Sequence, residues 1–300
     1  MEPDRLLLVI GDPIRDVYVE EKELQKPGST KLELVTEKII YSPGGSLNVF
    51  SNAREASSLT GTLVLNAPEF PLGNKLTDHI KNFEELSKAT YSDIYTIFRS
   101  SHIGRDIVLS PYQGKEDFYK SIRINAKQTV DLKTVRIPKR NLVNMPKALV
   151  LADYNKGILN RTFYKDYFSS YFDFCIVDSK YRSINTHLFN DCKVKIWHAT
   201  GDEYCPLFAQ NFDWVINTDG PNPVRLLKDN VLVKTFLVPR TEIINTCGAG
   251  DTFTATFASM LLRIKEINLQ TISKSIEYAI DSCQEVIQSK YTATVKTKIR

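Results

Sequence analysis

The stretch of sequence best suited to chemistry is residues 245–263, where two glycines and an acid stand directly before a predicted helix. Apolar residues recur there at spacings of three and four from Phe253 to Ile264, which is typical of the buried side of a helix. Gly248 and Gly250 have no Cβ atom, so several backbone N–H groups can turn toward one bound group. Because the start of a helix presents unpaired N–H donors and the positive end of its dipole, we predict that this segment binds an anion.

The acid in this stretch, Asp251, has two interpretations. An acid at the start of a helix often caps it, by accepting a hydrogen bond from a backbone N–H. An acid beside a bound phosphate can instead take the proton of an attacking hydroxyl group. The segment Gly248-Ala249-Gly250-Asp251 alone leaves both interpretations open.

A second group of polar residues follows the first predicted strand. Asp12 comes directly after that strand, and Asp16 lies four residues further on. Because open parallel sheets bind ligands at the carboxyl ends of their strands, these acids can hold the hydroxyl groups of a sugar, or they can cap a turn. Gly44 and Gly45 precede a predicted helix that carries Asn48, and they either let a ligand approach closely or form a plain helix entry.

Two further places combine charged side chains with predicted strands. Asp153 and Lys156 follow the buried strand predicted at residues 148–152, again at a carboxyl end. Arg123 and Lys127 belong to an alternating segment, where they either lie over a ligand or keep an edge strand in contact with water.

Strand and helix patterns alternate along most of the chain, which predicts an α/β domain with a doubly wound, mostly parallel sheet. Residues 14–41 and about 103–131 depart from this alternation and predict short strands of a separate small sheet. An antiparallel pair is predicted at residues 224–227 and 231–237, with its turn at Asp229 and Asn230. Core strands are predicted at residues 5–10, 61–66, 94–98, 148–152, 174–178, 194–197 and 213–216, a short strand at 242–244, and helices at 74–89, 161–171 and 272–288 as well as behind Asp251.

The composition argues against several classes of function. With 42% hydrophobic and 25% charged residues, the chain resembles ordinary globular proteins. A formal net charge of +4 without a long basic run does not indicate a nucleic-acid partner. Five cysteines without a CxxC pair argue against a disulfide framework or a zinc site, and no run of eighteen apolar residues predicts a membrane span. We therefore expect a cytoplasmic protein.

The order of these motifs resembles that of the PfkB, or ribokinase-like, carbohydrate kinases over essentially the whole chain. The early Gly-Gly followed by Asn of that family is matched here by Gly44, Gly45 and Asn48, and its late Asp-Thr-x-Gly-Ala-Gly-Asp by residues 245–251. The resemblance implies a single kinase domain over residues 1–300, folded as a three-layer α/β/α sandwich with a small β-sheet lid from about 14–41 and 103–131. Within the family the sequence is most similar to the D-glycero-D-manno-heptose-7-phosphate kinases, in residues 11–16, 152–157 and 291–295.

What the resemblance implies for function is transfer of a phosphoryl group from ATP, with Mg²⁺, to a hydroxyl of a sugar phosphate. Asp251 would be the general base, and N–H groups of the segment from Gly248 through Ala249 and Gly250 would stabilise the transferred charge. Thr218 and Gly220 would lie near the nucleotide together with Gly248 and Gly250, and Glu203 would reach Mg²⁺ through water. We also expect a homodimer formed through the lid. The sugar side would be lined by Asp12, Asp16, Gly44, Gly45, Asn48, Arg123, Asp153 and Lys156.

Three residues depart from the pattern of that family. Thr200 stands where the family has the Asn of Asn-x-x-Glu, Pro223 replaces a glycine of the nucleotide loop, and Asn245 replaces an Asp associated with a monovalent cation. Proline fixes φ and has no N–H donor, so these changes bear on nucleotide affinity and on cation dependence. Two alternatives therefore stay open, a kinase of another sugar or nucleoside and a catalytically weak relative that binds a sugar phosphate or nucleotide.

Overall fold

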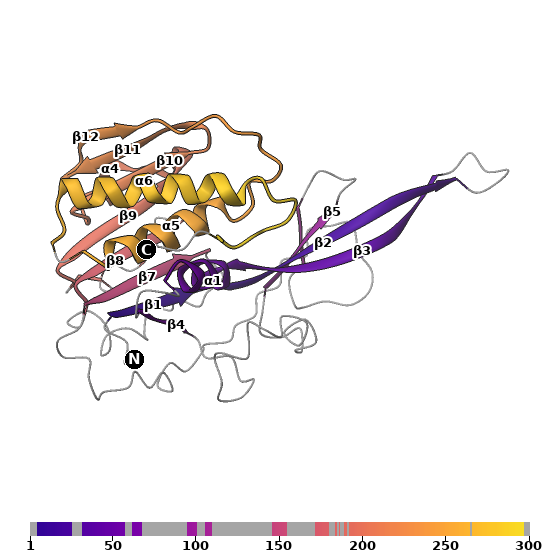
Figure 1. The fold of residues 1–300 in the computed structure, drawn as a ribbon, viewed down its shortest axis with the longest axis horizontal. Coiled ribbons are helices and arrows are strands. Elements are labelled where there is room, and N and C mark those ends of the chain that lie inside the picture. Colours follow the sequence, from indigo (N-terminus) through magenta and orange to yellow (C-terminus); the bar gives the residue numbers. More distant parts are fainter. Residues whose placement is uncertain are drawn as a thin grey trace.

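The computed structural model describes residues 5–25, 32–57, 62–67, 95–100, 106–109, 146–154, 172–179, 184, 186, 189–190, 192–264 and 266–296. They form an α/β fold around an eight-stranded, mostly parallel sheet (Figure 1). The predicted helices at 74–89 and 161–171 lie outside the described residues. From one edge to the other, the sheet contains β12 (Val231–Phe236), β11 (Asn222–Lys228), β10 (Trp214–Asp219), β9 (Val194–Thr200), β8 (Phe174–Ser179), β7 (Lys147–Asp153), β1 (Arg5–Gly11) and β4 (Thr62–Ala67).

The strand directions of this sheet follow the predicted pattern. The strands from β4 to β10 pair in parallel, while β11 pairs antiparallel with both β10 and β12. The predicted turn between β11 and β12 is confirmed, because Asp229 and Asn230 have φ values of 48° and 67°, the left-handed region that a two-residue hairpin turn requires.

The order of the strands reverses between β1 and β7. The chain passes from β1 to β4 on one side of β1, and later returns to add β7 on the other side. In open α/β sheets the ligand binds beyond the carboxyl ends of the strands at such a reversal. This topology directs attention to the residues that follow β1 and β7.

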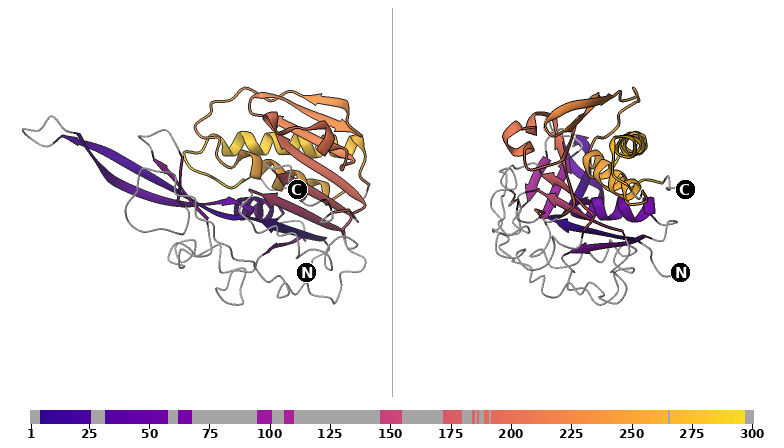
Figure 2. Two further views of the ribbon diagram at one scale, coloured as in Figure 1. Left: turned by 180° about the vertical axis from the view of Figure 1, so that it is seen from behind. Right: turned by 90° about the vertical axis from the view of Figure 1, so that its left-hand side faces the viewer.

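Both faces of the central strands β1, β7 and β8 are buried, which explains the continuous apolar runs in these segments of the sequence. Leu7, Val9 and Val150 point to the face covered by α1 (Ser46–Ser57), α5 (Ala249–Leu261) and α6 (Leu269–Val286), while Leu8 and Leu149 point to the other face. The right-hand view of Figure 2 shows these three helices together on one face. The other face packs against α4 (Pro206–Ala209).

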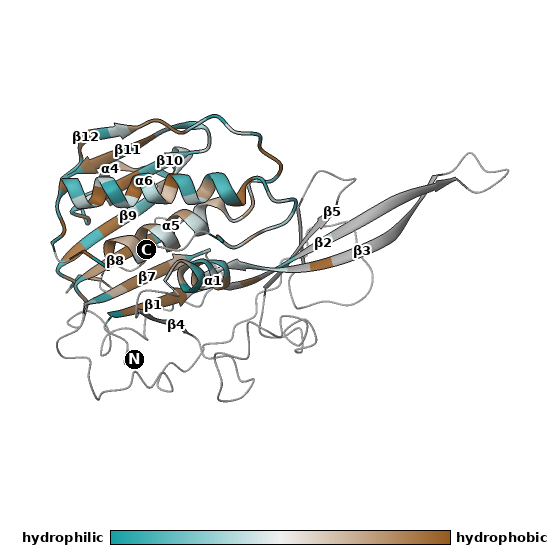
Figure 3. Ribbon diagram, in the orientation of Figure 1, coloured by the Kyte–Doolittle hydropathy of each residue, from teal (hydrophilic) through white to brown (hydrophobic). Residues whose placement is uncertain are grey.

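The outer helix α6 has one buried side, as its apolar spacing predicts. Ile272, Ile276 and Ala279 are buried against the core, and Figure 3 shows hydrophilic and hydrophobic residues alternating along this helix. Its first turn is capped by Asn268, whose side chain accepts a hydrogen bond from the N–H of Thr271 at 3.1 Å. No helix in the described ranges has the length and apolar character needed to cross a membrane.

A separate four-stranded sheet contains β3 (Leu32–Gly45), β2 (Pro13–Gln25), β5 (Tyr95–Ser100) and β6 (Asp106–Leu109), in that order. The antiparallel pair β2 and β3 forms a long hairpin that extends beyond the large sheet (Figure 1). The small sheet was predicted, but its first two strands are much longer than the short ones expected. The prediction that residues 94–98 belong to the central sheet was wrong, because β5 pairs in parallel with β2.

The strand predicted at residues 242–244 is also absent, since the described chain from 237 to 247 has no strand. The N–H groups of Ile244 and Asn245 instead donate to the carbonyl oxygen of Ile287 at the end of α6, at 2.9 and 3.1 Å. The approach to Gly248 is therefore an extended loop held by the C-terminal helix.

Candidate functional site

Two buried acids lie at the point where the strand order reverses. Asp12 follows β1, and its Oδ2 atom accepts a hydrogen bond from the N–H of Tyr154 at 2.8 Å. Asp153 ends β7, and its Oδ2 atom accepts from the hydroxyl of Ser179 at 3.0 Å. Both carboxylates are shielded from water, with exposed fractions of 0% and 8%. The structure thus brings together two of the predicted site residues through the ends of neighbouring strands.

The two glycines before α1 bring this helix onto the end of β1. Gly45 has φ 55°, and a Cβ atom there would lie 2.5 Å from the carbonyl oxygen of Asp12. The N–H of Ser46, the first residue of α1, donates to that same oxygen at 2.9 Å. A Cβ atom on Gly44 would lie 2.9 Å from Oδ2 of Asp16, which β2 carries and which is also buried. These glycines therefore allow a close contact within the protein, between the start of α1 and the end of β1.

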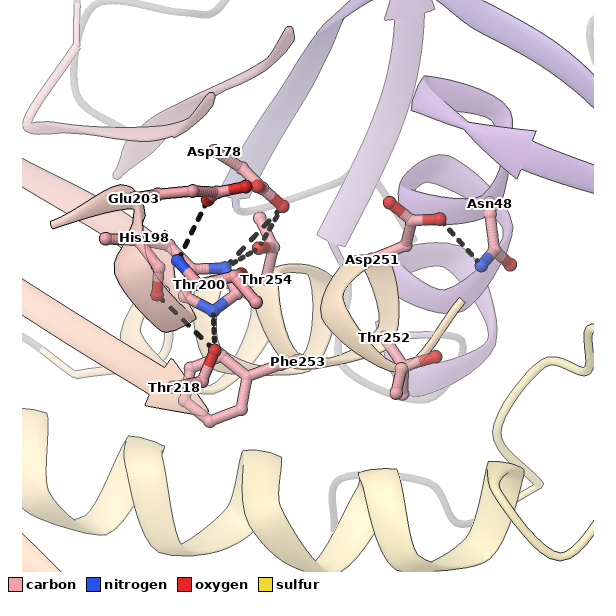
Figure 4. Close-up of polar contacts among 12 residues, drawn as sticks. Asn48, Asp178, His198, Thr200, Glu203, Thr218, Asp251, Thr252, Phe253 and Thr254 are labelled. Carbon is pink, nitrogen blue, oxygen red and sulfur yellow. Dashed lines mark hydrogen bonds and ion pairs between the residues drawn. The ribbon is translucent and has the colours of Figure 1, made fainter. Parts of the chain in front are cut away.

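Asp251 lies in the first turn of α5 and does not cap it. The N-cap residue is Gly248, with φ 81°, so Asp251 is the third residue of the helix. This position rules out the interpretation of Asp251 as a simple N-cap. Its side chain is buried, with 4% of the residue exposed, and points toward α1. One carboxylate oxygen, Oδ2, accepts a hydrogen bond from Nδ2 of Asn48 at 3.0 Å (Figure 4), and the other, Oδ1, accepts one from the hydroxyl of Tyr154.

Asn48 makes several hydrogen bonds besides the one to Asp251, and these fix the orientation of the Asp251 carboxylate. Its Nδ2 also reaches the carbonyl oxygen of Gly248 at 3.4 Å, and its Oδ1 accepts from Nδ2 of Asn52 at 2.9 Å. Asn52 in turn accepts from the N–H of Val295 at 3.0 Å, so the C-terminal segment braces the pair. Asn48 was predicted to line the sugar side, and here its amide is bonded to the carboxylate of Asp251.

The helix start in front of Asp251 retains the features expected of an anion site. The N–H groups of the first turn have no partner one turn earlier in the helix. Among the N–H groups predicted to bind the anion, the N–H of Ala249 already donates to the carbonyl oxygen of Thr246 at 3.2 Å. A Cβ atom built on Gly250 would meet no atom of the described residues within 4 Å, so the space before this residue is open.

Tyr154 was not identified from the sequence, although it occupies the centre of the site. Desolvation of its hydroxyl raises the pKa of Tyr154 well above the usual value, and the negative charges of Asp251, Asp178 and Asp16 and the hydrogen bond to Asp251 raise it further. The hydroxyl therefore stays protonated and donates to Asp251. The position directly after an acid at a strand end was the available signal, but the sequence argument considered only charged groups there.

A second network, also missed, crosses the ends of the next three strands (Figure 4). Asp178 in β8 accepts a hydrogen bond from the hydroxyl of Thr254 at 2.7 Å. The buried ring of His198 in β9 bonds Thr254 through Nδ1 at 2.7 Å and Thr218 through Nε2 at 3.0 Å. This ring also stacks on Phe253, with 4.8 Å between the ring centres. Thr218, predicted to lie near a nucleotide, is thereby linked to α5.

The remaining predicted residues of the nucleotide side lie at the ends of β9 and β10. Glu203 ends a short 3-10 helix, Gly201–Glu203, and its Oε2 accepts from the N–H of Thr200 at 3.0 Å. Gly220 lies in the exposed turn between β10 and β11, with φ 51°. Among the described residues, no group of three His, Cys, Asp or Glu side chains could hold a metal ion. Arg123 and Lys156 lie outside the described residues.

The structure also explains the residue that replaces the Asp of the late motif. Asn245 donates through Nδ2 to the hydroxyl of Tyr18 at 3.2 Å and to the carbonyl oxygen of Lys290 at 3.1 Å. The hydroxyl of Tyr18 also accepts the N–H of Thr292 at 2.9 Å, and the Thr292 hydroxyl donates to Asp16 at 3.1 Å. These hydrogen bonds connect the small sheet to the C-terminal segment.

Comparisons with known proteins give a family resemblance for part of the chain and a shared fold. Residues 198–299 match the model of the pfkB family carbohydrate kinases. A search of curated proteins gave no match to the chain. Solved structures of other proteins share its fold. The match to ribokinase from Thermotoga maritima has 15% identity and a TM-score of 0.58, and it covers 97% of this chain and 96% of that chain. Aminoimidazole riboside kinase from Salmonella enterica, complexed with aminoimidazole riboside and an ATP analog, has 14% identity and a TM-score of 0.62. This match covers 98% of this chain and 97% of that chain.

Phosphofructokinase-2 from Escherichia coli, solved with substrates and products, has 13% identity and a TM-score of 0.56, covering 97% of this chain and 95% of its own. At these identities the solved structures establish the fold, and the family match covers the part of the chain that contains Asp251. Residues 198–299 thus resemble the pfkB family carbohydrate kinases, and the solved structures show that the chain has a ribokinase-like fold.

Proposed function

We propose that the protein transfers the γ-phosphoryl group of ATP to a hydroxyl of a sugar phosphate, with Asp251 as the general base. The observation that carries this proposal is the position of Asp251, buried in the first turn of α5 beside the open space at Gly250. In the reaction the acceptor oxygen forms a bond to the γ-phosphorus, the bond from that phosphorus to the bridging oxygen breaks, and ADP leaves. Asp251 takes the proton that the acceptor hydroxyl loses, a contribution of roughly 10²- to 10⁴-fold in rate.

The charge of the transferred group would be stabilised by the start of α5. Phosphoryl transfer depends mainly on in-line placement and on donors for the negative charge that spreads over the equatorial oxygens. The N–H groups of Gly250 and Asp251 belong to the first turn, where the helix dipole also favours an anion. Because Ala249 already bonds Thr246, we assign it a smaller share of this role than the sequence indicated.

The sugar would be held by the acids at the reversal of the strand order. Asp12 and Asp16 are buried acids that accept hydrogen bonds from the N–H of Tyr154 and the hydroxyl of Thr292, and Asp153 ends the neighbouring strand. In the proposed complex their carboxylates would also accept from sugar hydroxyls. Each charged hydrogen bond contributes about 1.5–3 kcal/mol. The orientation of the sugar relative to Asp251 would therefore be determined by residues of β1, β2 and β7.

ATP would lie along the ends of β9 and β10, near Thr218 and Gly220. The Salmonella enterica relative was solved with an ATP analog, which supports ATP as the donor. Glu203, whose Oε2 accepts from the N–H of Thr200, fits a Mg²⁺ ion held through water, because Mg²⁺ keeps several of its waters while binding one or two carboxylates and the phosphates. When bound, the ion supplies positive charge that offsets the negative charge of the phosphates.

A monovalent cation does not fit the residues around Asn245. Its amide donates directly to the hydroxyl of Tyr18 and to the carbonyl oxygen of Lys290, so an N–H group faces oxygens that a cation would need as ligands. We therefore propose that activity is independent of K⁺. Equal rates in a Tris buffer with and without KCl would support this, and strong activation by KCl would contradict it.

The acceptor we propose is D-glycero-D-manno-heptose 7-phosphate, phosphorylated at its anomeric hydroxyl to give the 1,7-bisphosphate. This proposal depends on the likeness of residues 11–16, 152–157 and 291–295 to kinases of that sugar, and on Lys156 and Arg123 as cations for the distal phosphate. Binding of the distal phosphate would help to position the reacting hydroxyl, so the unphosphorylated heptose should lose turnover as well as affinity.

The test is ADP release from Mg²⁺-ATP with a panel of sugars, sugar phosphates and nucleosides. We expect the heptose 7-phosphate to give the highest kcat/KM, and Lys156→Ala to reduce it far more than it reduces the rate with a neutral sugar. If a neutral sugar or nucleoside is the best acceptor, the heptose assignment fails and the alternative of another acceptor within the family replaces it. If no member of the panel yields ADP, the proposed transfer fails, and the alternative of a catalytically weak relative that binds a sugar phosphate or nucleotide replaces it.

We also propose a homodimer formed through the small sheet. Within the described residues β3 and β6 are the edges of this sheet, and a second subunit would pair with or cover them. Light scattering at several concentrations measures this directly. A strictly monomeric protein in concentrated solution would contradict it.

A further inference from the structure

Both oxygens of the Asp251 carboxylate have a donor from the protein, and the two donors differ in character. Asn48 is fully buried and has three further contacts, so it is a fixed part of the core. Tyr154 follows the last residue of β7 and keeps part of its surface exposed. Its backbone N–H is anchored on Asp12 at 2.8 Å, so its main chain is fixed beside a proposed sugar contact.

The Tyr154 hydroxyl uses the same atom of Asp251 that a general base needs. It donates a hydrogen bond to Oδ1, while Oδ2 accepts a hydrogen bond from Nδ2 of Asn48. An acceptor hydroxyl that loses its proton to Asp251 must also donate to a carboxylate oxygen. Since Asn48 is fixed on Oδ2, the oxygen that can exchange its partner is Oδ1.

We propose that Tyr154 and the acceptor hydroxyl compete for Oδ1 of Asp251, and that Tyr154 thereby prevents water from being activated there. This inference rests on the proposed role of Asp251 as the base. A sugar held by Asp12 and Asp16 gains binding free energy from several hydroxyls and can displace the tyrosine hydroxyl. Water only exchanges one hydrogen bond for another. Phosphoryl transfer to the acceptor is thereby favoured over hydrolysis of ATP.

A different role for Tyr154 makes opposite predictions. If the tyrosine only orients Asp251 and stays bonded to it throughout the reaction, loss of the hydroxyl should lower transfer and hydrolysis together. If it competes, loss of the hydroxyl leaves room for a water molecule at Oδ1 and should raise hydrolysis. The sign of the change in hydrolysis without acceptor therefore separates the two roles.

The experiment compares Tyr154→Phe with the wild type in the full chain. ADP release from Mg²⁺-ATP is measured without acceptor and with the best acceptor of the panel. We expect hydrolysis without acceptor to rise by at least about tenfold, below the 10²- to 10⁴-fold that a general base contributes. Turnover with acceptor should stay within about threefold of the wild type, and the KM for the acceptor should fall because a competitor has been removed.

Matched controls make the result specific. Tyr204→Phe removes a hydroxyl that bonds Asn230 at 2.8 Å, remote from Asp251, and should change neither rate. In the double variant with Asp251→Asn, the added hydrolysis should disappear. Thermal melting checks the fold, and Tyr154→Leu, which also lacks the hydroxyl, replaces the phenylalanine variant if the latter does not fold.

The outcomes distinguish failure of this inference from failure of the proposed function. Unchanged or lower hydrolysis in a folded Tyr154→Phe protein that still transfers phosphate would overturn the competition, even if Asp251→Asn is inactive. Near-normal transfer by Asp251→Asn would instead remove the base, and with it the ground for the inference.

Discussion

Replacement of Gly248 by alanine tests the junction between α1 and α5 on which the site depends. Gly248 caps α5 with φ 81°, and a Cβ atom there would lie 2.4 Å from Nδ2 of Asn48 and 2.8 Å from Cγ2 of Thr292. Both neighbours are buried and hydrogen-bonded, so neither can move away without losing a contact. The substitution therefore combines backbone strain with a steric clash.

The two costs can be estimated separately. A non-glycine residue in the left-handed region costs about 1–2 kcal/mol, and forcing one carbon into a packed core costs about 1–3 kcal/mol. We expect Gly248→Ala to lower the free energy of unfolding by about 2–5 kcal/mol, which corresponds to a fall in Tm on the order of 10 °C. Turnover should fall as well, because Asn48 must leave Asp251 to make room.

Gly220→Ala is the matched control, since Gly220 has φ 51° but no atom within 4 Å of the added Cβ. This variant should lose only the backbone part, about 1–2 kcal/mol. Urea unfolding and thermal melting of both variants measure the difference. If Gly248→Ala is as stable as Gly220→Ala, the close contact with Asn48 does not exist in solution and the geometry assigned to Asp251 is wrong.

Three other predictions use single residues of the site. Gly250→Ala should keep or slightly raise stability, by roughly 0.5–1 kcal/mol, yet reduce kcat/KM for ATP because its methyl group enters the space proposed for phosphate; unchanged kinetics would count against the anion site. His198→Leu removes the hydrogen bonds between the ring and the hydroxyls of Thr254 and Thr218, each of which keeps a second partner, so it should cost about 0.5–1.5 kcal/mol for each bond in urea unfolding. A neutral result would refute that role. The raised pKa of Tyr154 means that the folded state holds its proton more tightly than the unfolded state, whose pKa is near 10.0. The contribution of this group to the free energy of unfolding should therefore be fully present below that pH and be lost as the pH rises above it. The loss of stability at high pH should be smaller in Tyr154→Phe.

The sequence predicted the central strands of the large sheet because β1, β7 and β8 are buried on both faces. Continuous apolar runs such as residues 148–152 are typical of strands that are buried on both faces. The same reasoning placed residues 94–98 in the wrong sheet, because an apolar run does not specify which strand lies beside it. Only the pairing of β5 with β2 decides this, and that pairing joins segments about eighty residues apart.

The site was predictable to the extent that its residues stand at strand ends or helix starts. Asp12, Asp153 and Asp251 were identified in this way, and Asp12 is joined to Asp251 through hydrogen bonds of Tyr154. Asp178 also lies near the end of a strand, yet its partner Thr254 lies on α5, and His198 has an unremarkable position within β9. Such contacts depend on the order of the strands and on which helix covers them, and neither is written in the local pattern.

Turnover of Asp251→Asn is the most direct test of the central claim. The fold should survive, because the amide oxygen can accept from Asn48 while the amide nitrogen donates to the hydroxyl of Tyr154. Binding of ATP and of the acceptor, measured by calorimetry, should change little. We predict a fall in kcat of roughly 10²-fold or more, since the proton of the acceptor hydroxyl has lost its base. A folded Asp251→Asn protein with turnover close to that of the wild type would contradict the account.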